Sequence, residues 1–144
     1  MARAIFLAAP DRGAGALALV ESLLRELQIV TGGALRGSDV FVPHLQVGDV
    51  GVEVDAPTFA ARTLAALDAA RVVIAVLDGA QTDDQVALLV GRAHARGIPV
   101  IGYATDARAK PALVASALAD AATDVRALSD ALAKVLTREG RREG

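Results

Sequence analysis

The 144-residue chain contains no cysteine, which excludes disulfide bonds, thiol catalysis and thiolate metal sites. Aromatic residues make up only 3% of it, so we expect no base-stacking surface for single-stranded nucleic acid. The net charge is −2, and no run of Lys and Arg is dense enough to hold a phosphate backbone. No apolar run approaches the about 20 residues that span a membrane, and a strand starting near Arg3 leaves no room for a signal peptide. These absences favour a soluble cytoplasmic protein that binds neither nucleic acid nor membranes.

An unbroken apolar run at Arg71–Leu77 predicts a strand that is buried on both faces. The polar loop that follows begins with Asp78-Gly79. We expect Thr82 to cap the next helix, with Gln85 as its capping-box partner three residues later. The apolar spacing carries this helix to about Arg96.

A further strand is expected at Ile98–Tyr103, after Gly97, which is suited to end the helix. A strand–helix–strand connection of this length joins parallel neighbours. Ligands of open α/β sheets lie beyond the carboxyl ends of the strands. We therefore expect the functional site at Asp78, Gly79 and Thr82–Gln85.

The rest of the chain continues the alternation of strands and helices. Strands are expected at Ala2–Ala9, Asp39–Pro43 and, at an edge, Thr123–Arg126, and helices at 15–27, Thr58–Ala70, 111–119 and 128–136. The segment His44–Pro57 is long for a loop in a compact domain, and such loops often bind or cover ligands. The pattern predicts a doubly wound, Rossmann- or flavodoxin-like parallel sheet of about five strands flanked by helices. It forms one domain over residues 1–137, followed by a flexible tail over 138–144.

A glycine pattern after the first strand formally matches the dinucleotide-binding fingerprint. Gly13–Ala18 reads GxGxxA. The fingerprint also needs an acidic residue at the end of the second strand, whereas here Asp39 precedes that strand and Pro43-His44 follows it. We therefore interpret the glycines as turn residues. A turn before a helix N-terminus can still hold an anion, with Arg12 beside it.

The acidic residues and histidines have simple structural interpretations. Asp83 and Asp84 lie in the first turn of a helix, where each stabilises the helix dipole by roughly 0.3–1 kcal/mol. Asp78-Gly79 is typical of a turn at a strand end. His44 and His94 are far apart in the sequence and belong to no motif, so no metal site is predicted.

Three segments resemble the nucleoside 2-deoxyribosyltransferase family and its relatives that hydrolyse deoxynucleoside monophosphates. Ile5–Pro10 (IFLAAP) is similar to the family's opening strand, of the form IYLAGP. Leu67–Gly79 (LDAARVVIAVLDG) resembles its "leeADvVvAvLDG" strand. Asp83–Gly102 resembles its "DxGTxxEiGyAxaxGkPviGl" block, and Arg12-Gly13 falls where phosphate-using relatives have an Arg-Gly turn. The likeness extends in the right order from about Arg3 to Asp106.

The resemblance implies glycosyl transfer. In the family, a Glu on the helix after the LDG loop attacks the anomeric carbon, the base leaves, and a second base or water resolves the intermediate. A Tyr on the first strand orients this Glu, and Asp residues bind the sugar hydroxyls. The resemblance also implies a nucleoside or nucleotide ligand, no cofactor, and a homo-oligomer of two or more copies.

This chain departs from the family at the reacting groups. The position of the Glu nucleophile holds Leu89, and the position of the Tyr holds Phe6. A family Asp falls at about Thr63, and the Gly-Thr pair at Gln85-Val86. Leucine cannot attack an anomeric carbon, so we expect Leu89 to pack into the pocket instead. The ligand-binding residues that the resemblance and the strand-end position imply are Phe6, Pro10, Arg12, Gly13, Asp78, Gly79, Asp83, Asp84 and Leu89.

Three hypotheses about function remain open. The first is a protein that binds a nucleoside-type ligand without cleaving it. The second is an active N-glycosidic transferase or hydrolase in which Asp78, Glu53 or Asp55 replaces the missing Glu. The third is an interaction module whose pocket is filled by Leu89 and Phe6.

Overall fold

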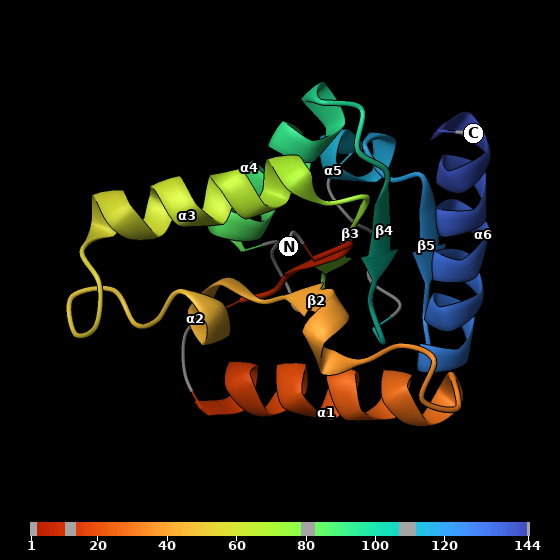
Figure 1. The fold of residues 1–144 in the computed structure, drawn as a ribbon, viewed down its shortest axis with the longest axis horizontal. Coiled ribbons are helices and arrows are strands. Elements are labelled where there is room, and N and C mark those ends of the chain that lie inside the picture. The colour runs from red at the N-terminus through yellow and green to blue at the C-terminus, as the bar shows by residue number, and fades with distance from the viewer. Residues whose placement is uncertain (1–2, 11–13, 79–82, 107–111, 144) are drawn as a thin grey trace.

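The five strands of the computed structural model form one parallel sheet (Figure 1). The structure describes residues 3–10, 14–78, 83–106 and 112–143. The strands are β1 (Ile5–Ala8), β2 (Val40–Phe41), β3 (Val72–Val76), β4 (Val100–Tyr103) and β5 (Asp120–Ala122). Their order is β2-β1-β3-β4-β5, and every neighbouring pair is parallel. This is the flavodoxin-like order, in which the connections reverse direction between β1 and β3. The predicted doubly wound fold is confirmed.

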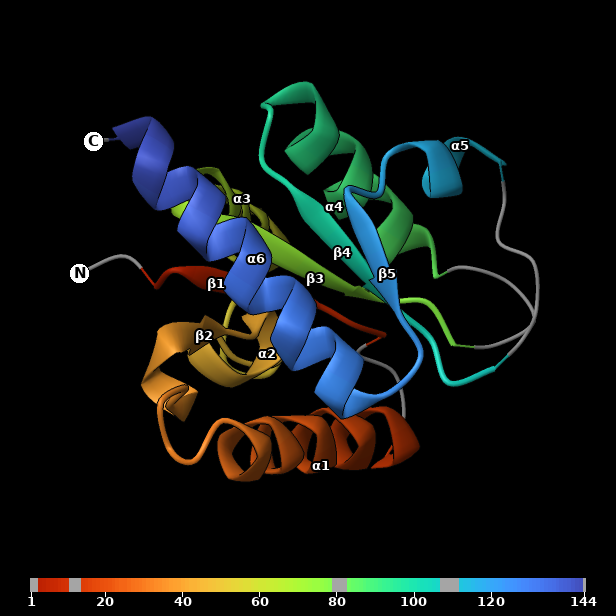
Figure 2. The same cartoon turned by 90° about the vertical axis from the view of Figure 1, so that its right-hand side faces the viewer.

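Helices cover both faces of this sheet. They are α1 (Ala14–Val30), α2 (Pro43–Gln46), α3 (Ala56–Ala69), α4 (Asp84–Ala95), α5 (Ala112–Ser116) and α6 (Val125–Glu143), with a 3₁₀ turn at Gly37–Asp39. In Figure 2, α6 crosses one face of the sheet beside α1, while α3 and α4 lie behind it. The helices predicted over 15–27 and up to about Arg96 are α1 and α4, and each packs an apolar face on the sheet.

Alternate residues of the strands enter two separate cores. Ile5, Leu7 and Ile74 point towards α1 and α6 and form the first core with residues such as Leu128. Phe6, Ala8, Val73 and Ala75 point the other way and form the second core with residues of α3 and α4. Successive side chains of a strand leave opposite faces, so burial on both faces requires the continuous apolar runs seen in the sequence.

Two helix starts differ from the prediction. Asp83, and not Thr82, caps α4, and its carboxylate accepts hydrogen bonds from the backbone N–H groups of Gln85 and Val86 at 2.9 and 3.2 Å. Threonine and aspartate are both good N-cap residues, and here the carboxylate of Asp83 has the geometry to cap the helix. Thr82 itself lies outside the described residues. Helix α3 starts at Ala56, two residues before the predicted Thr58.

The C-terminal elements also differ from the prediction. The edge strand is Asp120–Ala122, and not Thr123–Arg126. The carboxylate of Asp124 accepts a 2.8 Å hydrogen bond from the backbone N–H of Ala127, so this residue belongs to the start of α6. Helix α6 continues to Glu143, so the helix end predicted at Leu136 is wrong, and 138–143 are helical where a tail was expected. The residues of β5 have little preference for strands, and they form a strand because they pair with β4.

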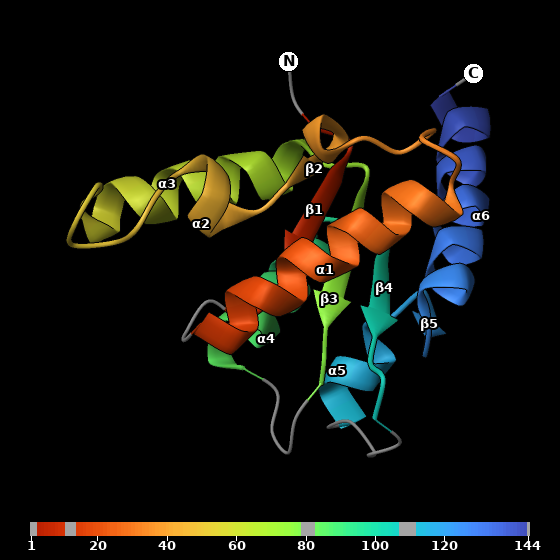
Figure 3. The ribbon, with the colours of Figure 1, turned by 90° about the horizontal axis from the view of Figure 1, so that it is seen from below.

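The segment expected to be a long loop forms an arm that projects from the sheet (Figures 1 and 3). It consists of α2, residues 47–55 and the first part of α3. Backbone hydrogen bonds close its tip, including Gly51 N–H to Val54 O at 2.7 Å. Gly48 has a φ of +118°, and a Cβ added there would lie 3.1 Å from the Cβ of Glu53, so the tip requires glycine at this position. In the described part of the chain, no helix has the length and apolar character to cross a membrane.

Candidate functional site

A small internal cavity lies beyond the carboxyl ends of β1 and β2, on the face covered by α3 and α4. Its volume is ≈20 Å³. We call it the inner chamber; its lining residues are Ala9, Pro43, His44, Phe59, Thr63, Gln85 and Leu89. Ala9 follows β1, and Pro43 begins the short helix after β2. The chamber thus occupies the end of the sheet where open α/β proteins bind ligands.

A wider pocket of ≈520 Å³ adjoins the inner chamber. We call it the outer pocket; its lining residues are His44, Gly48, Asp49, Val50, Val52, Ala56, Phe59 and Gln85. His44, Phe59 and Gln85 line both spaces and therefore stand at the boundary between them. The projecting arm supplies most of the outer wall. A segment expected from its length alone to bind or cover a ligand thus lines a pocket of ligand size.

Two buried polar atoms in the wall of the inner chamber have no hydrogen-bond partner within the described residues. They are Nε2 of His44 and Oγ1 of Thr63; in the described part of the chain, Nε of Arg71 is the only other such side-chain atom. Thr63 is only 5% exposed. A buried polar group without a partner costs about 1–3 kcal/mol, and most such groups in native proteins bind water or a ligand. Both atoms belong to residues that line the chamber, so unpartnered polar side chains meet there beside an otherwise apolar core.

Leu89 occupies the wall of the inner chamber next to these polar atoms. Its side chain is 8% exposed and belongs to the second core with Val86, Val90 and Ala93. Phe6 is fully buried beneath this region and stacks on Phe41, with ring centroids 5.6 Å apart and an angle of 20° between the rings. Leu89 therefore contacts the cavity directly, while Phe6 supports the core and lines neither space.

Two of the acidic residues singled out in the sequence, Asp78 and Asp83, accept hydrogen bonds from backbone N–H groups. Asp78 accepts hydrogen bonds from the backbone N–H and hydroxyl of Thr105, at 2.5 and 3.2 Å, and from the N–H of Asp106 at 3.3 Å. It joins the segment after β3 to the segment after β4. Asp83 caps α4, and Asp84 is exposed in the first turn of that helix. None of the three carboxylates lines the two spaces, and their ligand-binding role stays a prediction.

The remaining candidates from the N-terminal turn are only partly described. Pro10 is half-buried next to Ala9, a lining residue of the inner chamber. Arg12, Gly13 and Gly79 lie outside the described residues, so their predicted contacts are not tested.

Two of the carboxylates considered in the sequence as alternative nucleophiles also have structural partners. Asp55 caps α3, and its hydrogen bonds with the side chain and backbone of Thr58 lower the pKa of its carboxyl. Glu53 accepts a 3.2 Å hydrogen bond from the backbone N–H of Asp49. Asp49 is the carboxylate that lines the outer pocket in the described part of the chain, and the sequence analysis did not single it out.

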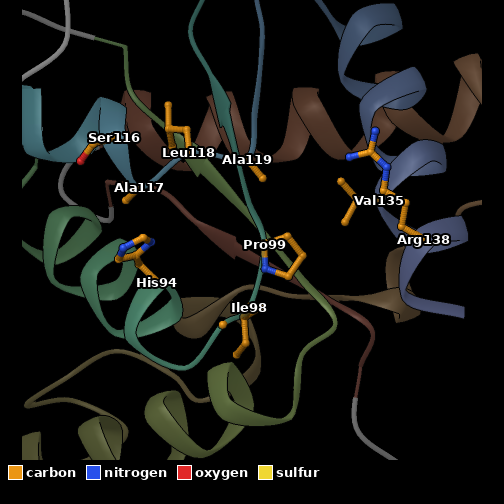
Figure 4. Close-up of a pocket in the computed structure, with 10 residues that line it drawn as sticks. His94, Ile98, Pro99, Ser116, Ala117, Leu118, Ala119, Val135 and Arg138 are labelled. Carbon is orange, nitrogen blue, oxygen red and sulfur yellow. The ribbon is translucent and has the colours of Figure 1, made fainter. Parts of the chain in front are cut away.

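A separate groove of ≈390 Å³ lies at the opposite end of the sheet from these two spaces, where β4 and β5 begin. Figure 4 shows His94 and Ser116 on one side of Pro99, and Val135 and Arg138 on the other. His44 and His94 thus belong to separate cavities at opposite ends of the sheet. The described residues include no group of three or more His, Cys, Asp or Glu side chains that could hold a metal ion.

Gln85 lies at the site, within the stretch Thr82–Gln85 expected there from the sequence, whereas His44 and Phe59 were not predicted as lining groups. One signal was available for His44, because it directly follows the second strand and such positions collect at one edge of a parallel sheet. Phe59 is an ordinary helix residue in the sequence, and only the packing of α3 and α4 brings it to the same cavity as Gln85.

The fold and the site together define an α/β protein of flavodoxin-like strand order with a pocket at the carboxyl edge of its sheet. Residues 5–133 match the family model described as nucleoside 2-deoxyribosyltransferase. The chain therefore belongs to this family, as its sequence motifs indicated. A comparison with curated protein sequences finds no match.

Solved structures of low sequence identity share the fold. A conserved protein from Enterococcus faecalis V583 has a TM-score of 0.75 and 18% identity, over 96% of this chain and 99% of its own. A 2-deoxyribosyltransferase from Bacillus psychrosaccharolyticus has a TM-score of 0.67 and 18% identity, over 87% and 89%. A CMP N-glycosidase from Clostridium botulinum has a TM-score of 0.55 and 12% identity, over 89% and 95%.

Proposed function

We propose that this protein binds a nucleoside- or nucleotide-type ligand in the outer pocket and the inner chamber, without breaking the ligand's N-glycosidic bond. The observation that carries the proposal is the pair of unpartnered polar atoms, on His44 and Thr63, at the inner end of a pocket in a family of nucleoside-processing proteins. The volume of ≈520 Å³ lies within the range of about 300–1,000 Å³ typical of small-molecule sites. The half-buried ring of Phe59 gives a planar base a surface on which to stack.

The proposal that the protein does not cleave its ligand rests on Leu89. The resemblance places it at the family's nucleophile position, and its side chain lies in the chamber wall. A hydrocarbon side chain can form no covalent glycosyl intermediate. The solved structures that share this fold include a 2-deoxyribosyltransferase and a CMP N-glycosidase. Both nucleosides and nucleotides should therefore be tested as ligands.

The test is a thermal-shift panel of nucleosides, 2′-deoxynucleosides and their 5′-monophosphates, followed by an assay for released base. We expect one class to raise the melting temperature, because a ligand of the native state stabilises it by mass action. We expect no free base from that ligand. The absence of any shift at millimolar ligand contradicts the proposal and favours the interaction module. Released base contradicts the non-catalytic part alone.

An active glycosyl enzyme with a different carboxylate is the second candidate, and the position of Asp49 in the outer pocket favours it. This candidate predicts base release that the change Asp49→Asn abolishes. Asp84→Asn is the matched control, because Asp84 is exposed and lines neither space. If Asp49→Asn, Asp55→Asn and Asp78→Asn each still release base, none of these carboxylates is the nucleophile.

Homo-oligomer formation is also part of the proposal. Val50 and Val52 of the arm are 47% and 84% exposed, and Leu88 of α4 is 69% exposed. Apolar side chains in these positions favour contact with a second copy. Sedimentation of the purified protein tests this, and a monomer at all concentrations contradicts it. The cytoplasmic location expected from the sequence stays a prediction.

A further inference from the structure

We propose that His44 and Thr63 together form a receptor for one uncharged hydrogen-bonding group of the ligand, a hydroxyl or an amide, and that the inner chamber excludes an ionised group. This inference rests on the proposed function, because it names which part of the ligand enters the chamber. It assigns His44 and Thr63 as specificity-determining residues.

The two side chains come from different elements and meet at one cavity. His44 belongs to α2 and Thr63 to α3, and both line the inner chamber. Their unpartnered atoms are buried, so no bulk water satisfies them. Gln85 of α4, which also lines the chamber, is the third polar side chain within reach of a group placed there. A ligand group that enters the chamber is therefore surrounded by polar side chains of three elements.

The size of the chamber limits what it can hold. Its ≈20 Å³ is close to the about 10–15 Å³ that a single water molecule needs. A hydroxyl or one edge of an amide fits this space, whereas a phosphate with its several oxygens does not. The phosphate of a nucleotide, if present, must remain in the outer pocket.

The chemistry of the wall excludes charge. Ala9, Pro43, Phe59 and Leu89 make up the apolar part of the lining. Among the described residues, no Lys, Arg, Asp or Glu lines the chamber, so within this wall an ionised group would lose its hydration without gaining an opposite charge. A threonine hydroxyl can donate and accept, and a neutral imidazole nitrogen does one or the other. Hydroxyl and amide groups complement this pair, because they can supply both a donor and an acceptor.

The test compares the wild-type protein with Thr63→Val, which keeps the shape of the side chain and removes its hydroxyl, and with His44→Leu. Calorimetric titration of the four common 2′-deoxynucleosides gives the dissociation constants. We expect each change to raise the dissociation constant about fivefold or more, the equivalent of one lost hydrogen bond. We also expect ligand-free Thr63→Val to melt at or above the wild-type temperature, because valine leaves no buried hydroxyl without a partner.

Two matched controls separate this role from general effects of substitution. Thr123→Val changes an exposed threonine, and His94→Leu changes the histidine of the opposite groove. Both should leave the dissociation constants unchanged. The next comparison is between a 2′-deoxynucleoside and its 2′,3′-dideoxy analogue. If the analogue binds the wild-type protein more weakly than the parent nucleoside does, but the two bind Thr63→Val equally well, the bound group is a sugar hydroxyl. Equal binding of both nucleosides by the wild-type protein, with the loss at Thr63→Val retained, excludes the 3′-hydroxyl and assigns the group to the base or to the 5′-hydroxyl.

Three outcomes overturn the inference, and they can be told apart. If Thr63→Val and His44→Leu both bind with the same dissociation constants as the wild-type protein, the inference is overturned while the proposed function stands. A ligand-free Thr63→Val protein that melts several degrees below the wild type shows that the hydroxyl supports the fold instead. Failure of the wild-type protein to bind any nucleoside or nucleotide removes both the proposed function and this inference.

Discussion

The carboxylate of Asp78 accepts hydrogen bonds from both the backbone N–H and the hydroxyl of Thr105, 27 residues away in the sequence. Asp78 follows β3 and Thr105 follows β4, so this contact joins two neighbouring strands at the edge of the sheet where the site lies. A residue that the family motif marks as functional thus has a structural task in this chain. Its carboxylate holds the two strand ends together.

Loss of this contact should destabilise the protein. We expect Asp78→Ala to lower the free energy of unfolding by about 1–2 kcal/mol, because it removes hydrogen bonds to a charged acceptor. Urea denaturation measures the change. Asp130→Ala, at an exposed position of α6, is the control and should change the free energy by less than about 0.5 kcal/mol. Equal values for the two variants would show that the Asp78 contact contributes nothing.

The ion pair between α3 and α4 should make stability depend on pH. Asp68 accepts two hydrogen bonds from Arg92, at 2.9 and 2.7 Å, and forms a second ion pair with Arg96 at 3.0 Å. The hydrogen bond from Arg92, followed by the charges of Arg92 and Arg96, lowers the pKa of Asp68 below its ordinary value of 3.8. The stabilisation is therefore fully present above pH 3.8 and is lost as the pH falls through the lower pKa of the folded state.

The variant Asp68→Asn tests this dependence. We expect it to denature at a lower urea concentration than the wild type at pH 7. The difference should shrink once the pH falls below 3.8, where the wild-type carboxyl also becomes neutral. A difference that stays constant down to pH 2 would assign the effect to packing and not to charge.

Leu89 should contribute strongly to stability. We expect Leu89→Ala to lower the free energy of unfolding by about 2–4 kcal/mol, because it removes buried carbon atoms and enlarges a cavity. Leu88→Ala is the matched control, since the neighbouring Leu88 is 69% exposed and should lose less than about 1 kcal/mol. Similar losses at the two positions would show that Leu89 is not packed in the chamber wall.

Gly48 should be required for the shape of the arm. Its φ of +118° and the 3.1 Å approach of Glu53 predict that Gly48→Ala destabilises the protein by more than about 1 kcal/mol. Gly91→Ala should do the opposite. Gly91 lies within α4 with nothing within 4 Å of an added Cβ, so alanine there should stabilise the protein by about 0.5–1 kcal/mol. Gly→Ala changes of the same sign at both sites would contradict the difference in backbone conformation.

The order of strands and helices was readable from the sequence because it depends on local patterns. The run at Arg71–Leu77 contains β3, and the helix predicted over 15–27 lies within α1. Predictions failed where a longer-range contact or a choice between neighbours decided the outcome. The segment Asp120–Ala122 is a strand because β4 pairs with it, and Asp83 caps α4 in place of the neighbouring threonine.

The family also followed from the sequence, because a motif such as LDG is a property of linear order. The inner chamber was not predictable in this way. Its wall combines residues as far apart as Ala9, His44 and Leu89. Whether the buried atoms of His44 and Thr63 find hydrogen-bond partners depends on how α2, α3 and α4 pack together. Side-chain identity decides which groups can form hydrogen bonds, but only three-dimensional packing decides which of them are left without a partner around a shared space.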